Sequence, residues 1–294
     1  MSNIECFIPS MSGADIETTV ESFSRSSSFT GVTVLDGISL RETETLRSLA
    51  DAISGKFVLI YTKDTPLEMG MFALDRIISI AEDTGADMLY ADHYELITGP
   101  DGETVRRKHP LIDCQRGALR DDFDFGSVLV FRRTAFRKAV REMKADRKWG
   151  ALYDLRLRMK RVVHINEYLY TEVESDLRKS GEKQFDYVNP KNREVQLENE
   201  RACTDHLKRI GAYLAPDEFD DLPHDDTQYP VEASVIIPVR NRVRTIRDAV
   251  ESVLSQEADF AYNIIVVDNH SDDGTTEVLR ELAMDERVVH LIPE

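Results

Sequence analysis

Cysteine is scarce in this 294-residue chain, which has three: Cys6, Cys114 and Cys203. Their odd number and wide separation argue against a disulfide framework or a zinc site, so we expect reduced core or surface thiols. Basic residues are also few, because 37 lysines and arginines stand against 54 acidic residues, a formal net charge of −17. Nucleic acids and anionic membranes bind basic faces, so this balance argues against both as partners.

Long apolar runs are absent as well. No stretch reaches the roughly 20 residues that a membrane span requires, and residues 1–8 lack the regions of a signal peptide. We therefore expect a cytoplasmic protein without a membrane span. The sequence also lacks the Gly-x-Gly-x-x-Gly, Walker P-loop, Gly-x-Ser-x-Gly and His-Glu-x-x-His motifs. Dinucleotide redox chemistry, P-loop hydrolysis, serine hydrolysis and zinc proteolysis thus lose their usual sequence support.

The most informative pattern lies in residues 233–276. Ser234–Val239 is a continuous, mostly apolar run, which predicts a parallel strand covered on both faces. Apolar residues at helical spacing follow between 246 and 254, and a second strand over Ile264–Val267 ends at Asp268. This pattern predicts a βαβ unit whose polar groups gather at the carboxyl ends of its strands. Nucleotides bind at that edge in open parallel sheets.

These residues resemble the opening of a family 2 glycosyltransferase with the GT-A fold. The resemblance lies in Ser-Val-Ile-Ile-Pro-Val-Arg-Asn at 234–241 and Val-Val-Asp-Asn-His-Ser-Asp-Asp-Gly-Thr at 266–275. It implies inverting transfer of a sugar from a nucleotide-sugar, here a UDP-sugar, to a saccharide acceptor in polysaccharide or glycoconjugate synthesis. It also implies Mn²⁺ or Mg²⁺ on the donor diphosphate, and partner proteins in polysaccharide assembly. The alternative is another Rossmann-like strand pair.

The resemblance also implies which residues contact the uracil and ribose of the donor. Val239 offers a backbone amide to the base, Asn269 can pair with a pyrimidine edge, and Asp268 can accept a hydrogen bond from a hydroxyl. The full set of expected donor contacts is Pro238, Val239, Arg240, Asp268 and Asn269.

The first half of the chain repeats the order strand, helix, strand and carboxylate, with strands predicted at Glu5–Pro9 and Gly31–Asp36. We therefore expect an α/β protein with a GT-A, Rossmann-like mixed sheet flanked by helices, followed by a partial second GT-A-like lobe. The expected parts are a degenerate first lobe at 1–214, an acidic linker at 215–230 and an incomplete nucleotide-binding part at 231–294.

That last part is small for a stable core, so we also expect the natural protein to continue past Glu294.

The predicted strand Lys56–Tyr61 ends in Thr62-Lys63-Asp64, where the family has an Asp-x-Asp metal motif. Asp64 keeps one carboxylate and is the candidate metal ligand, whereas Lys63 places an ammonium where the cation would lie. A lysine there could itself neutralise a phosphate. The alternative is a degenerate site with Asp64 solvated or capping. A literal Asp-x-Asp at 122–124 precedes a strand, which favours an acceptor-loop acid or a solvated loop over a metal site.

Two aspartates are candidates for catalysis. Asp92, with His93, follows the predicted strand Ala86–Tyr90 and would line the acceptor side or belong to a structural loop. The family's Glu-Asp pair, which supplies the general base, is replaced by Ala151-Leu152. Asp154 remains for that role, with orientation of the helix and loop as its alternative.

The first lobe therefore also admits a non-catalytic function in saccharide recognition or assembly. Nucleotidyl transfer is a further rival, disfavoured because its glycine-rich activating loop is absent.

The residues Thr65-Pro66-Leu67-Glu68 have the pattern of a helix capping box with proline at the first helical position. They predict a helix that runs from here to Gly85 and turns Met71, Leu74 and Ile78 toward the sheet.

Overall fold

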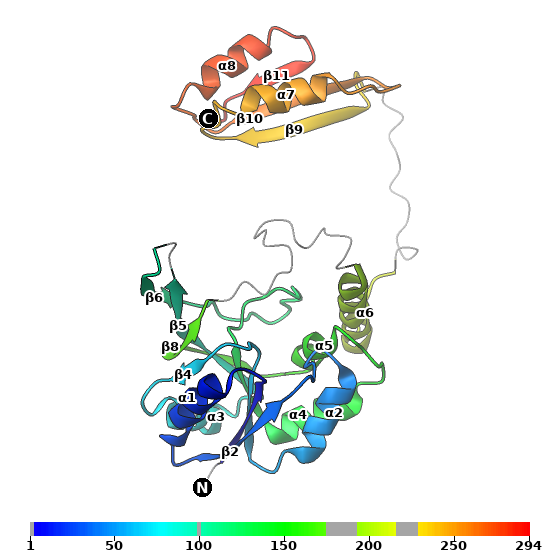
Figure 1. Ribbon diagram of the computed structural model, residues 1–294. Helices are drawn as coiled ribbons and strands as arrows, with labels where there is room; N and C mark the ends of the chain where they lie inside the picture. The colour runs from blue at the N-terminus through cyan, green and yellow to red at the C-terminus, as the bar shows by residue number, and fades with distance from the viewer. Residues whose placement is uncertain (1–2, 99–100, 175–192, 216–228) are drawn as a thin grey trace. The chain divides into compact units, whose positions relative to one another are not determined.

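The computed structural model describes residues 3–98, 101–174, 193–215 and 229–294. The chain divides into two compact units, Met1–Ala215 and Pro216–Glu294 (Figure 1). The predicted acidic linker at 215–230 falls almost wholly outside the described residues.

The first unit is built on a mixed sheet of eight strands in the order β2-β1-β3-β7-β5-β8-β4, with β6 paired to β5. Its elements are β1 (Ile4–Pro9), α1 (Gly13–Ser24), β2 (Phe29–Leu35), α2 (Thr43–Ala52), β3 (Phe57–Tyr61), β4 (Leu67–Met69), α3 (Ala73–Thr84), β5 (Met88–Thr98), β6 (Thr104–His109), β7 (Val128–Arg132), α4 (Arg133–Glu142), α5 (Ala151–Leu157), β8 (Val162–Val173) and α6 (Arg193–Ile210). Strands β1, β2 and β3 are parallel, and β7 runs antiparallel between β3 and β5.

Helices cover both faces of this sheet. On one face, Phe23 of α1 and Leu74 of α3 join a buried core, and on the other face Leu46 of α2 and Phe136 of α4 do the same. Strand β3 lies between these layers, and all of Phe57–Tyr61 is buried, as its continuous apolar run predicts. The predicted α/β class, a mixed sheet flanked by helices, is confirmed.

The predicted start of the third helix is wrong. The capping-box residues 65–68 lead into strand β4, which pairs antiparallel with β8, so the backbone there is extended. Helix α3 begins only at Ala73. Met71 precedes it and is 77% exposed, whereas Leu74 and Ile78 face the core as predicted. Pairing with a distant strand outweighed a local helix pattern worth about 1 kcal/mol.

Helix α6, with 18 residues, packs against α5 through Ala202, Tyr153 and Leu157. It carries charged residues along most of its length. Across the described part of the chain, no helix combines the length and apolar character needed to cross a membrane.

The second unit has a parallel sheet in the order β11-β10-β9. Its elements are β9 (Ala233–Val239), α7 (Ile246–Leu254), β10 (Tyr262–Asp268), α8 (Thr275–Leu282) and β11 (Val288–Leu291). Helices α7 and α8 both pack on one face of the sheet, where Val250 and Leu279 meet Ile264 and Val266 (Figure 1). Both crossovers advance in the same direction along the sheet, and right-handed connections then place both helices on one side.

The opposite face of this sheet is open within the described residues. Ile236 is 63% exposed, and Val289 and Leu291 are 37% and 48% exposed. The prediction that Ser234–Val239 is covered on both faces is therefore wrong for the described structure. The apolar run correctly predicts a strand, but it does not determine whether other elements cover one face of that strand or both.

Candidate functional site

Glu172 of β8 lies beside His93 of β5 and Lys63, which follows the end of β3. Its side chain is 1% exposed and contacts the Lys63 ammonium at 2.5 Å, His93 Nε2 at 3.3 Å and the Ser127 hydroxyl, which donates to it. Burial would raise the pKa of Glu172, but the hydrogen bond from His93 and the charge of Lys63 outweigh burial and hold the pKa below its usual value. Glu172 is thus a buried carboxylate kept charged by an internal cation.

This arrangement bears on the candidate metal ligand Asp64. Asp64 is exposed, and the neighbouring Lys63 side chain is only 17% exposed and paired with Glu172. The Lys63 ammonium therefore neutralises the Glu172 carboxylate, which could otherwise bind a divalent cation at the end of β3. The same ammonium would repel such a cation. Residues 62–64 thus offer a divalent cation one exposed carboxylate beside a paired ammonium, and the role of Asp64 as a ligand stays a prediction.

Asp92 lies inside strand β5, since the predicted strand Ala86–Tyr90 continues through it. Its carboxylate is 1% exposed and accepts from the Leu111 backbone amide at 2.8 Å, with His164 Nε2 also at 2.8 Å. His164 Nδ1 lies 2.8 Å from Asp113. Side chains alternate along a strand, so Asp92 and His93 point to opposite faces of the sheet and do not share a site.

Asp154, the candidate base, is 1% exposed and lies between two buried arginines. Arg147 Nε is 3.2 Å from Asp154 Oδ2, and Arg158 Nε is 2.8 Å from Asp154 Oδ1. Arg147 also reaches Asp205 on α6 at 2.7 Å. This geometry corresponds to the predicted alternative, in which Asp154 orients its helix and the neighbouring chain. Its role as a base stays a prediction.

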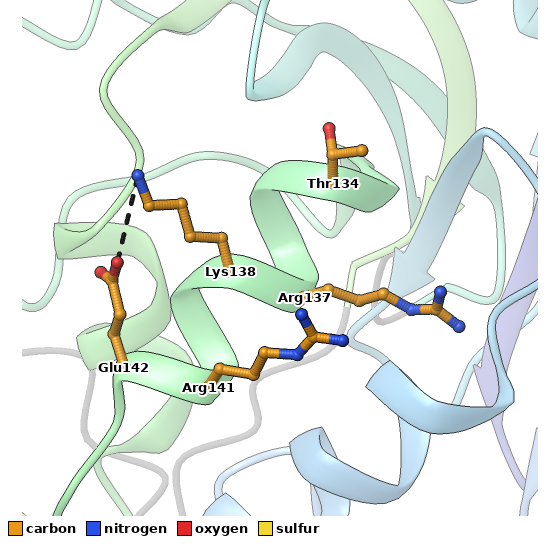
Figure 2. Close-up of a pocket in the computed structure, with 5 residues that line it drawn as sticks. All are labelled: Thr134, Arg137, Lys138, Arg141 and Glu142. Atoms are coloured by element: carbon orange, nitrogen blue, oxygen red, sulfur yellow. Dashed lines mark ion pairs between the residues drawn. The ribbon is translucent and has the colours of Figure 1, made fainter.

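A surface depression lies on α4, and its lining residue Glu142 accepts from Arg158 through its backbone carbonyl at 3.0 Å. Figure 2 shows its lining residues, including Lys138 and Glu142, which form an ion pair at 4.0 Å one turn apart. Arg137 donates to the carbonyl oxygens of Ala50 and Ile53, both at 2.7 Å, so it satisfies the carboxyl end of α2. We therefore assign these side chains a structural role.

In the second unit, the loops after β9 and β10 are bonded to each other at the carboxyl edge of the sheet. The Asn241 amide N–H donates to the Ser271 hydroxyl at 2.9 Å, and Asn241 Oδ1 accepts from the Asp272 amide at 3.0 Å. The Val243 amide donates to Asp273 Oδ2 at 3.1 Å. Asn241 has a positive φ of 55°, which asparagine tolerates better than most residues. These bonds fix the edge to which the donor contacts were assigned.

The five predicted donor contacts converge at this edge, but they differ in exposure. Pro238, Arg240 and Asn269 are exposed, whereas Val239 and Asp268 are buried. The backbone N–H of Asn269 donates to the backbone carbonyl of Val239 at 2.8 Å, and this bond joins the two strand ends. The exposed members are free to meet a ligand.

Asp268 is 0% exposed and already bonded within the unit. It accepts from the Ser271 amide at 3.0 Å and from the Thr276 hydroxyl at 2.5 Å, and His290 Nε2 lies 3.5 Å away. Burial would raise the pKa of Asp268, but the hydrogen bonds from Ser271 and Thr276 hold it below its usual value. Its geometry is that of a residue that positions the loop after β10, and its predicted contact with a donor stays a prediction.

Sequence reasoning missed Glu172 and Ser127. Glu172 lies in a run of mainly apolar and aromatic residues, and an acid in such a run is the sequence feature that could have identified it. Its partners, Lys63, His93 and Ser127, are distant in the chain and become neighbours only through strand pairing.

Comparison with known proteins gives one family match, since residues 234–294 match the model described as glycosyl transferase family 2. No curated protein matches the sequence. Among solved structures, the chain is similar to TarS 1-349 of S. aureus in complex with UDP-GlcNAc, at 12% identity over 72% of this chain and 73% of that chain, with a TM-score of 0.42. It is also similar to glucosyl-3-phosphoglycerate synthase from Mycobacterium tuberculosis in complex with Mn²⁺, UDP-glucose and phosphoglyceric acid, at 12% identity over 69% and 80%, with a TM-score of 0.43.

Proposed function

Since residues 234–294 belong to glycosyl transferase family 2, we propose that the protein transfers a sugar from a nucleotide-sugar, a UDP-sugar, to a saccharide acceptor with inversion. The observation that carries this proposal is the family match at the edge where Pro238, Arg240 and Asn269 lie exposed. We place the reaction in the cytoplasm, in polysaccharide or glycoconjugate synthesis with partner proteins.

Within this proposal the exposed residues contact the nucleoside and the buried ones hold them in place. Asn269 offers a side-chain amide that can donate to and accept from a pyrimidine edge. Arg240 brings a cation to an anionic donor. Asp268 supports the loop after β10 through its bonds to Ser271 and Thr276. A divalent cation would stabilise the leaving diphosphate, and we assign none of the described residues to it.

The experiment makes two measurements on the full chain. Calorimetry measures UDP binding with and without Mn²⁺, and an activity assay measures UDP release from UDP-glucose and UDP-N-acetylglucosamine. Asn269→Ala and Arg240→Ala should each weaken UDP binding about tenfold, because each removes one charged or polar contact. Arg280→Ala is the matched control, since it removes the same charge from an exposed position on α8. Absence of UDP binding by the unchanged chain would refute the proposal.

A second function is favoured for the first unit by the state of its carboxylates. Asp92, Asp154 and Glu172 are each about 1–2% exposed and each is bonded to buried basic groups. Carboxylates fixed in this way support the alternative of a non-catalytic module for saccharide recognition or assembly. Unchanged UDP release after Asp64→Ala would favour this alternative, and a large loss would assign the first unit to the reaction.

A further inference from the structure

Strands β5 and β6 bring two histidines and a glutamate together on one face of the first sheet. His93 and His109 are direct cross-strand partners, and Glu95 lies two residues along β5 on the same face as His93. One ligand atom from each of these three side chains lies within 4.8 Å of the other two. The imidazole rings of His93 and His109 stack with centroids 4.5 Å apart.

His93 leaves one ring nitrogen without a partner. Its Nε2 lies 3.3 Å from Glu172 Oε1, so that nitrogen carries the proton and donates. The other nitrogen, Nδ1, then presents a lone pair, and within the described structure it is buried with no hydrogen-bond partner. The side chain is 2% exposed. A buried, unpaired acceptor is unfavourable unless something binds it.

His109 differs from His93, because both of its ring nitrogens face a carboxylate. Its Nε2 lies 2.8 Å from Asp124 Oδ2, and its Nδ1 lies 3.2 Å from Glu95 Oε1. In both histidines a carboxylate faces Nε2, but only His93 has an unpaired Nδ1. Glu95 already contacts His109 Nδ1 through Oε1 and accepts from Arg107 at 2.9 Å through Oε2, so an ion would have to displace these contacts. Metal-binding histidines have this pattern, in which a carboxylate on the far nitrogen fixes the tautomer and orients the ring.

Gly126 keeps the space beside His93 open. A Cβ at this position would lie 3.3 Å from His93 Nδ1 and 2.3 Å from Tyr170 Oη. The φ of Gly126 is +66°, which also favours glycine. A side chain at this position would therefore fill the approach to the unpaired nitrogen.

We propose that His93, Glu95 and His109 bind a Zn²⁺-type transition-metal ion through the two Nδ1 atoms and a Glu95 oxygen, with Glu172 and Asp124 orienting the rings. Two imidazoles and one carboxylate suit Zn²⁺ better than Mg²⁺. Tetrahedral bonds of about 2.0–2.1 Å place ligand atoms about 3.3 Å apart, so the three side chains close toward one another on binding. Three protein ligands leave one position for an exchangeable ligand such as water or phosphate. The three ligands are other residues than 62–64, although Lys63 and His93 share the carboxylate of Glu172. The proposal does not depend on the proposed sugar transfer.

The test titrates the full chain with Zn²⁺ alone, with Mg²⁺ alone, and with Co²⁺ monitored by visible absorption. We expect one Zn²⁺ per chain, a tetrahedral Co²⁺ spectrum and no comparable effect of Mg²⁺. His109→Ala and Glu95→Gln should weaken Zn²⁺ binding more than about 100-fold, because each removes a ligand. Asp124→Asn should weaken it about 10–100-fold while the fold is kept, because this carboxylate is 56% exposed and acts through His109.

Two variants control for general effects. Asp122→Asn removes an exposed carboxylate two residues from Asp124 that pairs with Arg120 instead, and Cys203→Ser removes a thiol that could bind zinc adventitiously. Both should bind Zn²⁺ as the unchanged chain does. Absence of Zn²⁺ binding, binding that survives His109→Ala, or equal weakening by Asp122→Asn and Asp124→Asn would each overturn the proposal and leave the trio as a structural stack.

Discussion

Asp154 is one carboxylate that serves two buried guanidinium groups. Arg147 and Arg158 are 4% and 8% exposed at their side chains, and neither can regain water if Asp154 is removed. Removing one partner of a buried ion pair costs far more than the pair itself contributes, because the remaining charge stays buried without compensation. The residue is therefore important for stability whatever its part in catalysis.

We predict that Asp154→Ala lowers the free energy of unfolding of the first unit by about 3–5 kcal/mol. Asp205→Ala is the control, because Asp205 pairs with the same Arg147 but its side chain is 52% exposed. It should cost about 1 kcal/mol or less. Urea unfolding followed by the fluorescence of Trp149 measures both. A small loss for Asp154→Ala would show that the arginines find other partners.

Asp268 gives the second unit a dependence on acid. Its folded pKa lies below the unfolded value because of hydrogen bonds from Ser271 and Thr276 that outweigh burial. Such a group contributes stability above the unfolded pKa of about 3.9, and the contribution is lost as the pH falls through the folded pKa. We predict that the second unit loses stability as the pH falls from about 5 to about 3.

Asp268→Asn should remove the share of this acid dependence that comes from Asp268 and lower the stability at about pH 6. Asp272→Asn, an exposed change in the same loop, should keep the dependence. Hydrogen exchange of the β10 amides at several pH values measures this effect within the full chain. Equal acid sensitivity of Asp268→Asn and the unchanged protein would contradict the assignment.

At the scale of elements, the second sheet has one packed face and one open face. Ile264 of β10 is 0% exposed beneath α7 and α8, whereas Ile236 of β9 is 63% exposed on the other side. The same isoleucine-to-alanine substitution on each face can therefore compare the stability contributed by a buried side chain with that contributed by an exposed one.

We predict that Ile264→Ala lowers the free energy of unfolding of the second unit by about 2–5 kcal/mol, the usual cost of truncating a buried isoleucine. Ile236→Ala should cost less than about 1 kcal/mol, because most of the side chain already meets solvent. Chemical unfolding monitored by circular dichroism compares the two. Equal losses would indicate that Ile236 is covered in solution.

The elements that the sequence predicted well are those whose own residues determine them. Phe57–Tyr61 is apolar throughout and is a central strand, and Gly85 ends α3 in the left-handed conformation, at φ +66°. The prediction failed where a distant partner decided the structure, as at β4, which became a strand through pairing with β8. It failed again for the covering of β9, because a strand's composition does not say how many of its faces are packed.

At the scale of the whole molecule, the chemistry of the first unit comes from segments far apart in the chain. Lys63 and Glu172 are separated by 109 positions, and Ser127 and Glu172 by 45. No motif spacing could predict these contacts, because they depend on which strands become neighbours. The proximity of Val239 and Asn269 in the second unit was predictable, since both belong to one βαβ unit and its topology alone brings them together.

Strand β5 also limits which insertions and deletions the protein can tolerate in evolution. Its alternation sends Asp92 toward His164 and sends His93 toward Glu172 and His109. A single inserted or deleted residue in this strand would exchange its two faces and break both sets of contacts at once. The pairing of β5 with β8 shifts register between Ala91 and His93, but the extra residues there belong to β8, between Ile165 and Tyr170, so β5 itself keeps its alternation. The contacts of Asp92 and those of His93 are therefore kept or lost together when the length of β5 changes.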